Sequence, residues 1–556
     1  MVAEFFQDAP GLTNQYDDDP LLASYLRQRL PPKMIAEIEP SLRRLGGRAA
    51  GELLALDAAA EAQPPRHVPY DAWGRRIDAI PTSHAWRELD RIAAEEGLVA
   101  IGYERKHGAL SRIDQFARLY LYAPSSATYS CPLAMTDGAA RLLELYPDEV
   151  TRPVFEHFIS RDPERFWTSG QWMTERTGGS DVSATSTVAV AQGASYRLHG
   201  TKWFTSATTS QIAITLAYVQ PERGRERSLS VFLVQLRDAD GALRGIRVNR
   251  LKDKLGTRAL PTAELTLDGA PAHLVGEAGQ GVRKIAALFN VTRVYNAVAA
   301  VAGMRRAIAL ARDYARRRVA FGKPLSDHPL HAETLAAMET EWRAAFMLAF
   351  HVVELLGRQE CNEASTNELA RLRLLIPIAK LYTAKQAVAV ASEALESFGG
   401  AGYIEDTGLP RLLRDAQVLP IWEGTTNVLS LDVLRALEKT SGLTAVLDDA
   451  RQRLAGVRSE TLASAVGRVR DALQRIEAFA DRFAQEGRAF AEVRARSFAY
   501  AIARTMAGLL LLEHADWSIA AGESTAAVTA ATRWCARDLA RLEDDEGPVP
   551  SPMFIG

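Results

Sequence analysis

The sequence predicts an α+β fold in which a helical N-terminal domain, an antiparallel β-barrel or sandwich and a bundle of long helices follow one another. Three patterns predict it. Apolar residues recur at three- and four-residue spacing up to about residue 170, short β-rich runs fill residues 187–275, and long stretches of helical periodicity follow. We expect four domains, at residues 1–170, 171–278, 279–440 and 441–556, the last an additional helical module.

Length and composition limit the class of protein. A chain of 556 residues exceeds one ordinary core and suggests three or four domains. A hydrophobic content of 47% with 24% charged residues is typical of a soluble globular enzyme. The formal net charge of −2 provides no overall positive potential that would attract nucleic acid. Composition therefore favours neither nucleic acid nor a membrane as partner.

Cysteine usage and the N-terminal residues predict the compartment. Cys131, Cys361 and Cys535 lie far apart, without the spacing of a zinc site or a disulfide framework. The first twenty residues have neither a basic segment nor an apolar segment of a secretory signal. The apolar stretch "AGLLLLEHADW" is shorter than the roughly 18 residues of a membrane span. We therefore expect a cytoplasmic protein without a membrane segment.

The N-terminal region is predicted to be helical with loops. The runs "LLASYLRQRL", "SLRRLGGRAAGELLALDAAAEA" and "HAWRELDRIAAEEGL" carry apolar residues at helical spacing. Between the last two, "AQPPRHVPYDAWG" (residues 62–74) is predicted to be a linker, because Pro-Pro and His-Val-Pro disfavour helix.

Six short runs in residues 187–275 are typical of strands: "TVAVA", "SYRLHG", "IAITLAYV", "LSVFLVQL", "GIRVNRL" and "AELTLDG". Turns rich in Gly, Pro and Asp separate them. A compact antiparallel β-domain accounts for this pattern.

Long helices are predicted from residue 281 onward. Apolar residues recur every three or four positions from 281 to "AFGKP", and two further long helices are expected at 331–358 and 367–398. An antiparallel helical bundle follows from their length. Residues 441–556 are again helical, with 14 arginines against 16 acidic residues, so this module is not basic overall.

The usual dinucleotide and metal motifs are absent from the sequence. "GEAGQG" (276–281) has the wrong glycine spacing for a Rossmann fingerprint, "FGKP" is not followed by the Ser or Thr of a phosphate loop, and His-Glu-x-x-His does not occur. A nucleotide cofactor would need another architecture.

Five other motifs each have a structural and a functional interpretation. The loop "QWMTERTGGSDVSATST" (171–187) suits close approach of a polar ligand, or is an ordinary turn. "HGTKWFTSATTS" (199–210) is an aromatic site wall, or core and turn. "RRRVAFGKP" (316–324) either binds a ligand or places cations at a helix C-terminus. "FGGAGY" (398–403) either contacts a phosphate or caps a helix. In "PIWEGTTN", Glu423 is a catalytic acid or base, or precedes a helix start capped by Thr425 or Thr426.

In their order along the chain, these motifs resemble the acyl-CoA dehydrogenase family over roughly residues 131–437. "CPLAMTDGAA", "MTERTGGSDV", "KWFTS", "RLKDKLGTR" and "IWEGTTN" are most similar to the branch that contains AidB and its long acyl-CoA dehydrogenase relatives. The C-terminal module and the "YDAWGRR" segment also resemble that branch. The resemblance implies an FAD-dependent enzyme that dehydrogenates a medium- or long-chain acyl-CoA.

The resemblance implies that FAD lies between the β-domain and the helical bundle. By motif position, Met173, Thr174 and Ser180 would meet the flavin ring and the thioester region, while Phe204 and Ser206 would cover the ring and its N5 edge.

Family members bind part of the FAD from a neighbouring subunit. The resemblance therefore implies a homodimer at least, and a homotetramer built as a dimer of dimers, with an electron-transferring flavoprotein as electron acceptor. Thr425 and Asn427 would contact the adenosine part within their own subunit. The residues that would act across the interface are Arg318, Phe321, Glu396, Gly399 and Gly400.

Glu423 aligns with the base that removes the α-proton of the acyl-CoA, while the β-hydrogen leaves as hydride to the flavin. Some family members carry the base on the long helix instead, directly before an arginine, where this chain has Thr292 and Arg293. We expect Arg293, with Ser180, to contact the substrate.

Three positions depart from the commoner family pattern. The first loop contains Arg-Thr-Gly-Gly in place of Pro-Gly-Ala-Gly, and Trp422 stands where tyrosine is common, both as in the AidB-like branch. Glu396 stands where glutamine is usual, which would place a carboxylate near a cofactor phosphate.

Two other functions are open to this sequence. One is a flavoprotein of the DNA alkylation response that binds DNA through its C-terminal module; DNA is not the favoured partner, because the module's arginines are also consistent with a solvated helix face. The other is a nitroalkane-type oxidase, which the glutamate at 423 disfavours because such oxidases use aspartate. The arginines that would form the DNA-binding patch are Arg494, Arg496, Arg504, Arg533 and Arg537.

Overall fold

The computed structural model describes residues 8–220 and 228–542. The chain forms two compact units. The helical unit consists of Met1–Arg44, His107–Ile113 and Asn296–Gly556, and the barrel unit of Leu45–Lys106 and Asp114–Tyr295. The α+β fold class is confirmed, and the four domain boundaries stay a prediction.

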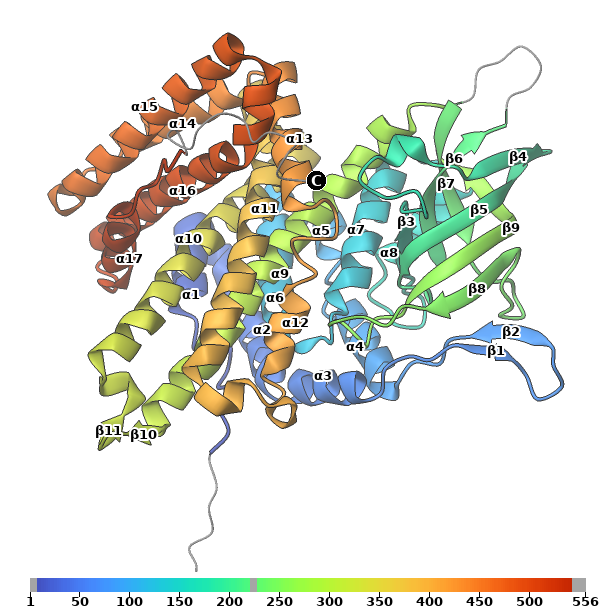
Figure 1. Cartoon of the computed structure of the whole chain (residues 1–556), viewed down its shortest axis with the longest axis horizontal. Coiled ribbons are helices and arrows are strands. Elements are labelled where there is room, and N and C mark those ends of the chain that lie inside the picture. The colour runs from blue at the N-terminus through green and yellow to red at the C-terminus, as the bar shows by residue number, and fades with distance from the viewer. Residues whose placement is uncertain (1–7, 221–227, 543–556) are drawn as a thin grey trace, which may run out of the picture. The chain divides into compact units, whose positions relative to one another are not determined.

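Helices dominate both units (Figure 1). In chain order they are α1 (Pro20–Arg29), α2 (Pro32–Ala50), α3 (Glu52–Ala62), α4 (His84–Glu95), α5 (Ile101–Glu104), α6 (Ser111–Tyr122), α7 (Ser130–Leu145), α8 (Thr151–Phe158), α9 (Gly281–Arg317), α10 (Pro329–Glu360), α11 (Thr366–Ser397), α12 (Pro410–Ala416), α13 (Thr426–Lys439), α14 (Gly442–Ala455), α15 (Ala463–Glu486), α16 (Arg488–Ala520) and α17 (Ala526–Cys535).

The barrel unit contains a closed ring of strands in the order β6, β4, β5, β9, β7 and back to β6 (Figure 1). All six strands predicted from the sequence are present. The strands of this sheet are β3 (Ser169–Trp172), β4 (Val188–Gln192), β5 (Ser195–Ser206), β6 (Ile212–Val219), β7 (Ser228–Gln235), β8 (Ile246–Leu251) and β9 (Thr262–Leu274).

The sequence suggested a purely antiparallel sheet, but the sheet is mixed. Strand β3 pairs with β6 in parallel, and β4 pairs with β6 in parallel at the ring closure. The sequence of β3, "SGQW", contains neither alternation nor β-branched residues, so its pairing depends on β6 rather than on its own propensity. The barrel interior is apolar, with fully buried side chains such as Leu198, Phe232 and Leu265.

A hairpin begins in the segment predicted as a linker (62–74), with its second strand directly after that segment. Strands β1 (Val68–Tyr70) and β2 (Arg76–Ala79) pair antiparallel. The Arg76 guanidinium donates to the Val248 carbonyl at 2.8 Å, and the Val248 amide donates to Asp78 at 3.1 Å. Contacts with β8 therefore fix β2, which pairs with β1, the strand that contains Pro69.

The long helices of the helical unit confirm the expected bundle. Helix α10 extends two residues beyond each predicted end, and α11 begins one residue earlier than predicted because Ser365 and Glu368 form a capping box. Within α10, Phe346 and Phe350 stack with ring centroids 4.3 Å apart, and Tyr25 of α1 packs edge-on against both rings.

Among the described residues, α9 and α11 are long and apolar enough to cross a membrane by length and composition. However, 67% and 78% of their most apolar windows are buried inside the protein, as in core helices. They are therefore weak evidence for a membrane span.

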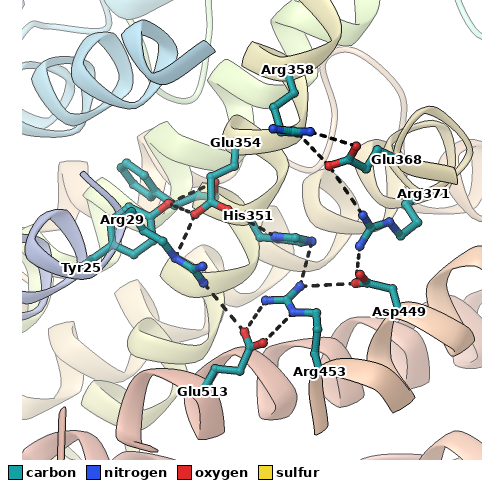
Figure 2. A network of polar contacts seen from close by, with 11 residues as sticks. Tyr25, Arg29, His351, Glu354, Arg358, Glu368, Arg371, Asp449, Arg453 and Glu513 are labelled. Carbon is teal, nitrogen blue, oxygen red and sulfur yellow. Dashed lines mark hydrogen bonds and ion pairs between the residues drawn. The ribbon is translucent and has the colours of Figure 1, made fainter. Parts of the chain in front are cut away.

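A network of ion pairs joins the C-terminal module to the rest of the helical unit. Figure 2 shows charged side chains of α1, α10, α11, α14 and α16 meeting in it. Arg453 of α14 contacts Glu513 of α16 at 2.7 Å, and Arg371 of α11 contacts Asp449 of α14. The other members are Tyr25 and Arg29 of α1, His351, Glu354 and Arg358 of α10, and Glu368 of α11.

Glu354 shows the strength of this network. Burial alone would raise the pKa of its carboxyl, but the contacts with His351 and Arg29 outweigh burial and lower the pKa to about 2. A depressed carboxyl pKa stabilises the fold above about pH 4.5, and this contribution is lost as the pH falls toward 2. The contacts of Glu354 with α1 and with His351 therefore stabilise the helical unit at neutral pH.

His514 of α16 makes stability depend on pH in a higher range. Its Nδ1 donates to Gln28 at 2.9 Å and its Nε2 accepts from Ser24 at 3.0 Å, so the neutral ring is satisfied. Burial, with Arg343 and Arg29 nearby, lowers the pKa of His514 to about 4. The unfolded chain, where histidine has a pKa of about 6.5, binds the proton more readily, so stability falls as the pH drops from about 6.5 to 4.

We predict that His514→Gln flattens this dependence. The wild-type protein should lose up to about 3 kcal/mol of unfolding free energy across that window through this group, and the variant should not. The measurement is the thermal midpoint of both proteins at pH 7 and pH 5. His84→Gln, at an exposed position, is the control and should behave as wild type. An equal loss of midpoint in His514→Gln and wild type would contradict the assignment.

Candidate active site

The predicted site residues fall into two sets, one in each unit. The barrel unit holds Met173, Thr174, Ser180, Phe204, Ser206 and Arg293. The helical unit holds Arg318, Phe321, Glu396, Gly399, Gly400, Glu423, Thr425 and Asn427.

The loop after β3 folds back onto the end of β5. Met173 is buried, and the Trp203 amide donates to the Thr174 carbonyl at 3.0 Å. A Cβ on Gly179 would lie 2.4 Å from the Thr174 hydroxyl, so the loop requires glycine at this close approach. The structure thus brings the "MTERTGG" and "KWFTS" motifs together, while Ser180 stays exposed on the loop.

A buried ion pair anchors this loop. The Glu175 carboxylate accepts from the Lys202 ammonium at 2.8 Å and from the backbone amides of Ser186 and Thr187 at 2.7 and 3.2 Å. The hydroxyls of Ser186 and Thr187 also donate to it, each at 2.5 Å. Lys202 donates further to the Leu216 carbonyl of β6 at 3.1 Å. Sequence reasoning missed this anchor, because no spacing rule relates residues 175 and 202.

Electrostatics favour the charged form of Glu175. Burial would raise its pKa, but the Lys202 ammonium and the hydroxyl donors outweigh burial and lower the pKa to about 2. Burial lowers the pKa of Lys202, and Glu175 opposes that shift. The pair therefore stabilises the loop at neutral pH, and its contribution is lost as the pH falls from about 4.5 toward 2.

An exposed aromatic face adjoins the loop. The Phe204 side chain is 55% exposed, and the Lys252 ammonium lies 4.6 Å from its ring centroid and 3.8 Å from that of Trp203. The hydroxyls of Ser206 and Thr262 lie 3.0 Å apart. Lys252 lies within the quoted motif "RLKDKLGTR", but its position over the aromatic pair was not predicted.

Thr292, the alternative position of a base, belongs to the helix packing. It is fully buried, and its hydroxyl donates to the Phe289 carbonyl at 3.1 Å. A Cβ on Gly138 of α7 would lie 2.9 Å from Leu288, so α7 and α9 are in close contact here. Arg293 is half-buried on the next position of α9.

Glu423 has an unusual backbone conformation in the helical unit. Its φ angle is +60°, and that of Gly424 is +109°. The left-handed region costs a residue with a side chain about 1–2 kcal/mol. Such strained residues concentrate at functional sites. Thr425 then caps α13 by accepting from the Val428 amide at 3.4 Å, and Asn427 is exposed on the first turn.

Two further motifs of the helical unit lie side by side. Tyr314 of α9 packs against Phe398, with ring centroids 5.2 Å apart, which brings the end of α9 next to "FGGAGY". Beyond α9, Arg318 is exposed and Phe321 is 97% exposed. A Cβ on Gly399 or Gly400 would meet no atom within 4 Å, so the backbone of both glycines is open. Glu396 is exposed on the last turn of α11.

A cavity of about 500 Å³ lies in the C-terminal part of the helical unit. Helices α13 to α16 line it with apolar side chains such as Leu434 and Phe483 and with charged ones such as Arg488. None of the predicted site residues lines it, so it is distinct from the candidate site.

Four family models match the chain. The N-terminal domain of adaptive response protein AidB matches residues 9–162, and the middle domain of acyl-CoA dehydrogenase matches 170–270. The C-terminal domain of acyl-CoA dehydrogenase matches 279–438, and the C-terminal domain-like model of acyl-CoA dehydrogenase 11 matches 442–548.

Known proteins resemble the chain over most of its length. Acyl-CoA dehydrogenase family member 11 of Caenorhabditis elegans is 44% identical over 549 residues, which cover 96% of this chain and 88% of that protein. AidB of Escherichia coli (strain K12) is 35% identical over 409 residues, or 72% and 74% of the two chains.

Two solved structures share the fold. The crystal structure of Caenorhabditis elegans ACDH-11 in complex with C11-CoA has a TM-score of 0.93 and 44% identity, covering 97% of this chain and 94% of that one. The apo-form of Bd2924 has a TM-score of 0.85 and 50% identity, covering 92% and 100%.

We predict that Lys202→Met destabilises the protein by about 3–5 kcal/mol, because it leaves the Glu175 carboxylate buried without its cation. The double variant Glu175→Gln/Lys202→Met should recover most of the loss. The measurement is the free energy of unfolding from chemical denaturation. Arg161→Met, which breaks an exposed pair with Glu104, is the control and should cost less than about 1 kcal/mol. A Lys202→Met cost as small as the control's would refute the anchor.

Proposed function

The chain belongs to the acyl-CoA dehydrogenase family, and we propose on that basis that it is a cytoplasmic, FAD-dependent enzyme that forms the α,β double bond of a medium- or long-chain acyl-CoA. The likeness to ACDH-11, solved with C11-CoA, supports an acyl-CoA of this size range as substrate. The single observation that carries the assignment of the base is the strained Glu423 between Trp422 and Gly424, in the family's motif position.

The residues present fit FAD. Gly399 and Gly400 offer open backbone, which a side chain at either position would fill, so a phosphate can approach their amides. Phe204 offers a half-exposed aromatic face on which a flat ring can stack. When bound, FAD supplies the acceptor for the hydride that leaves the β-carbon.

In this proposal the protein's own residues bind and orient the cofactor and the substrate. Met173, Thr174, Ser180, Phe204 and Ser206 hold the flavin ring. Ser180 and Arg293 contact the acyl-CoA, while Thr425 and Asn427 bind the adenosine part.

Glu423 takes the α-proton on its carboxylate. The electron pair of that C–H bond becomes the new carbon–carbon double bond as the β-hydrogen leaves with its own pair. Proton and hydride thus leave adjacent carbons, and the acyl-CoA is oxidised by two electrons.

A homotetramer, built as a dimer of dimers, is part of the proposal. In the helical unit Phe321, Tyr403 and Leu330 are 97%, 89% and 81% exposed. Exposed large apolar side chains of this kind are typical of protein interfaces. This supports roles across the interface for Arg318, Phe321, Glu396, Gly399 and Gly400. We propose an electron-transferring flavoprotein as the electron acceptor.

DNA binding through the C-terminal module has less support. Arg533 and Arg537 pair with Glu333 and Glu341 of α10, and Arg504 donates to the carbonyls at 539 and 541. Arg494 and Arg496 lie over the rings of Phe490 and Tyr500, at 6.0 and 5.8 Å from the ring centroids. All five arginines of the hypothetical patch therefore have intramolecular contacts, and the two ion pairs reduce the charge available to phosphates.

We predict that Glu423→Gln abolishes turnover while FAD content and acyl-CoA binding stay near wild type. An amide cannot accept the α-proton, and loss of a general base typically costs 10²–10⁴-fold. The measurements are flavin content, the Kd for C11-CoA, and exchange of the α-hydrogen with deuterium from solvent. Glu438→Gln, an exposed glutamate on α13, is the control and should retain activity. Wild-type exchange in Glu423→Gln would place the base elsewhere.

A further inference from the structure

The segment that carries Glu423 has little regular structure of its own. The amides of Ile421 and Trp422 both donate to the Val418 carbonyl, at 2.9 and 3.1 Å. Glu423 and Gly424 then adopt positive φ angles before α13 begins at Thr426. A turn that includes a left-handed glutamate persists only when surrounding contacts impose it.

Two buried side chains from other helices contact the carbonyls on either side of Glu423. Lys380 of α11 donates from Nζ to the Gly424 carbonyl at 2.7 Å. Asn296 of α9 donates from Nδ2 to the Leu419 carbonyl at 3.0 Å. Both side chains belong to residues with 0% exposure. Since a carbonyl only accepts, the asparagine must present its NH₂ group here.

Keeping these two residues in the core is costly. A buried ammonium carries a desolvation penalty of several kcal/mol. The Oδ1 of Asn296 is buried without a hydrogen-bond partner among the described residues, which costs roughly 1–3 kcal/mol. Leucine or methionine would fill both positions at lower cost. A requirement at the contacted segment explains why polar groups stand there.

A third contact restricts the same turn. A Cβ on Gly424 would lie 2.9 Å from Leu429 of α13, so the turn lies close against the helix that follows. The carbonyls at 419 and 424 enclose four residues, and Glu423 is the last of them. The two carbonyl contacts and this close approach therefore restrict the backbone at Glu423.

We infer that Lys380 and Asn296 are positioning residues for the proposed base. They hold the 419–424 segment in the strained conformation that directs the Glu423 carboxylate. The inference rests on the proposed function. Its energetic basis is orientation, because displacement of a catalytic group by about 1 Å can cost roughly 10²-fold in rate.

The test compares Lys380→Met and Asn296→Leu with wild type. Both replacements are apolar and of similar size, so the core stays filled while the carbonyl contact is lost. We expect α-hydrogen exchange and kcat to fall about 10- to 100-fold. Flavin content and the Kd for C11-CoA should stay within about threefold, as expected when only orientation is lost.

The control is Lys284→Met. Lys284 is also a buried lysine of a long helix that donates to a carbonyl, at Val275, remote in sequence from Glu423. The Lys284→Met variant should have a lower thermal midpoint, while kcat should not fall more than binding of C11-CoA does. Wild-type kcat in Lys380→Met and Asn296→Leu would overturn the inference, as would losses that match Lys284→Met in every readout.

Glu423→Gln in the same assays separates the two hypotheses. If Glu423→Gln is inactive while both positioning variants are fully active, only the positioning inference fails. If Glu423→Gln is fully active, the proposed base fails, and a fall in kcat for Lys380→Met would then have another origin.

Discussion

A buried ammonium must be met by oxygen atoms, and this constraint shapes both sets of site residues. Lys202 in the barrel unit and Lys380 in the helical unit are each fully buried. Lys202 meets the Glu175 carboxylate and fixes the loop after β3, while Lys380 meets the Gly424 carbonyl and restricts the turn at Glu423. In each case a charge that costs free energy to bury gives an irregular segment a defined conformation.

Charged side chains of the C-terminal module also meet oxygen atoms of neighbouring segments. Several of its arginines turn inward to acids of α10 and α16, or to the carbonyls after α17, and its Asp449 accepts from Arg371 of α11. A module held by half-buried and exposed ion pairs stabilises the helical bundle on which the Glu423 turn lies. The arginine count alone could not distinguish this arrangement from an open basic surface, because helical spacing is compatible with both.

The regular elements could be predicted because each repeats its own pattern. The six barrel strands and helices α9, α10 and α11 follow from β-rich runs and from apolar residues at helical spacing. Strand β3 could not be predicted, since it pairs with β6, which is distant in sequence. The β1–β2 hairpin could not be predicted either, because the prolines before and within β1 disfavour regular structure and contacts with Val248 fix β2. For the same reason the sequence suggests Glu423 by its motif but conceals its left-handed backbone and the buried lysine that contacts the next carbonyl.

The proposed function requires the chain to oxidise acyl-CoA thioesters with bound FAD. Anaerobic titration of the purified holoenzyme with C11-CoA, followed by flavin absorbance and product analysis, tests it most directly. We expect bleaching of the oxidised flavin, with one α,β-unsaturated acyl-CoA formed per flavin. Flavin that stays oxidised with C11-CoA and with shorter and longer acyl-CoAs alike would contradict it.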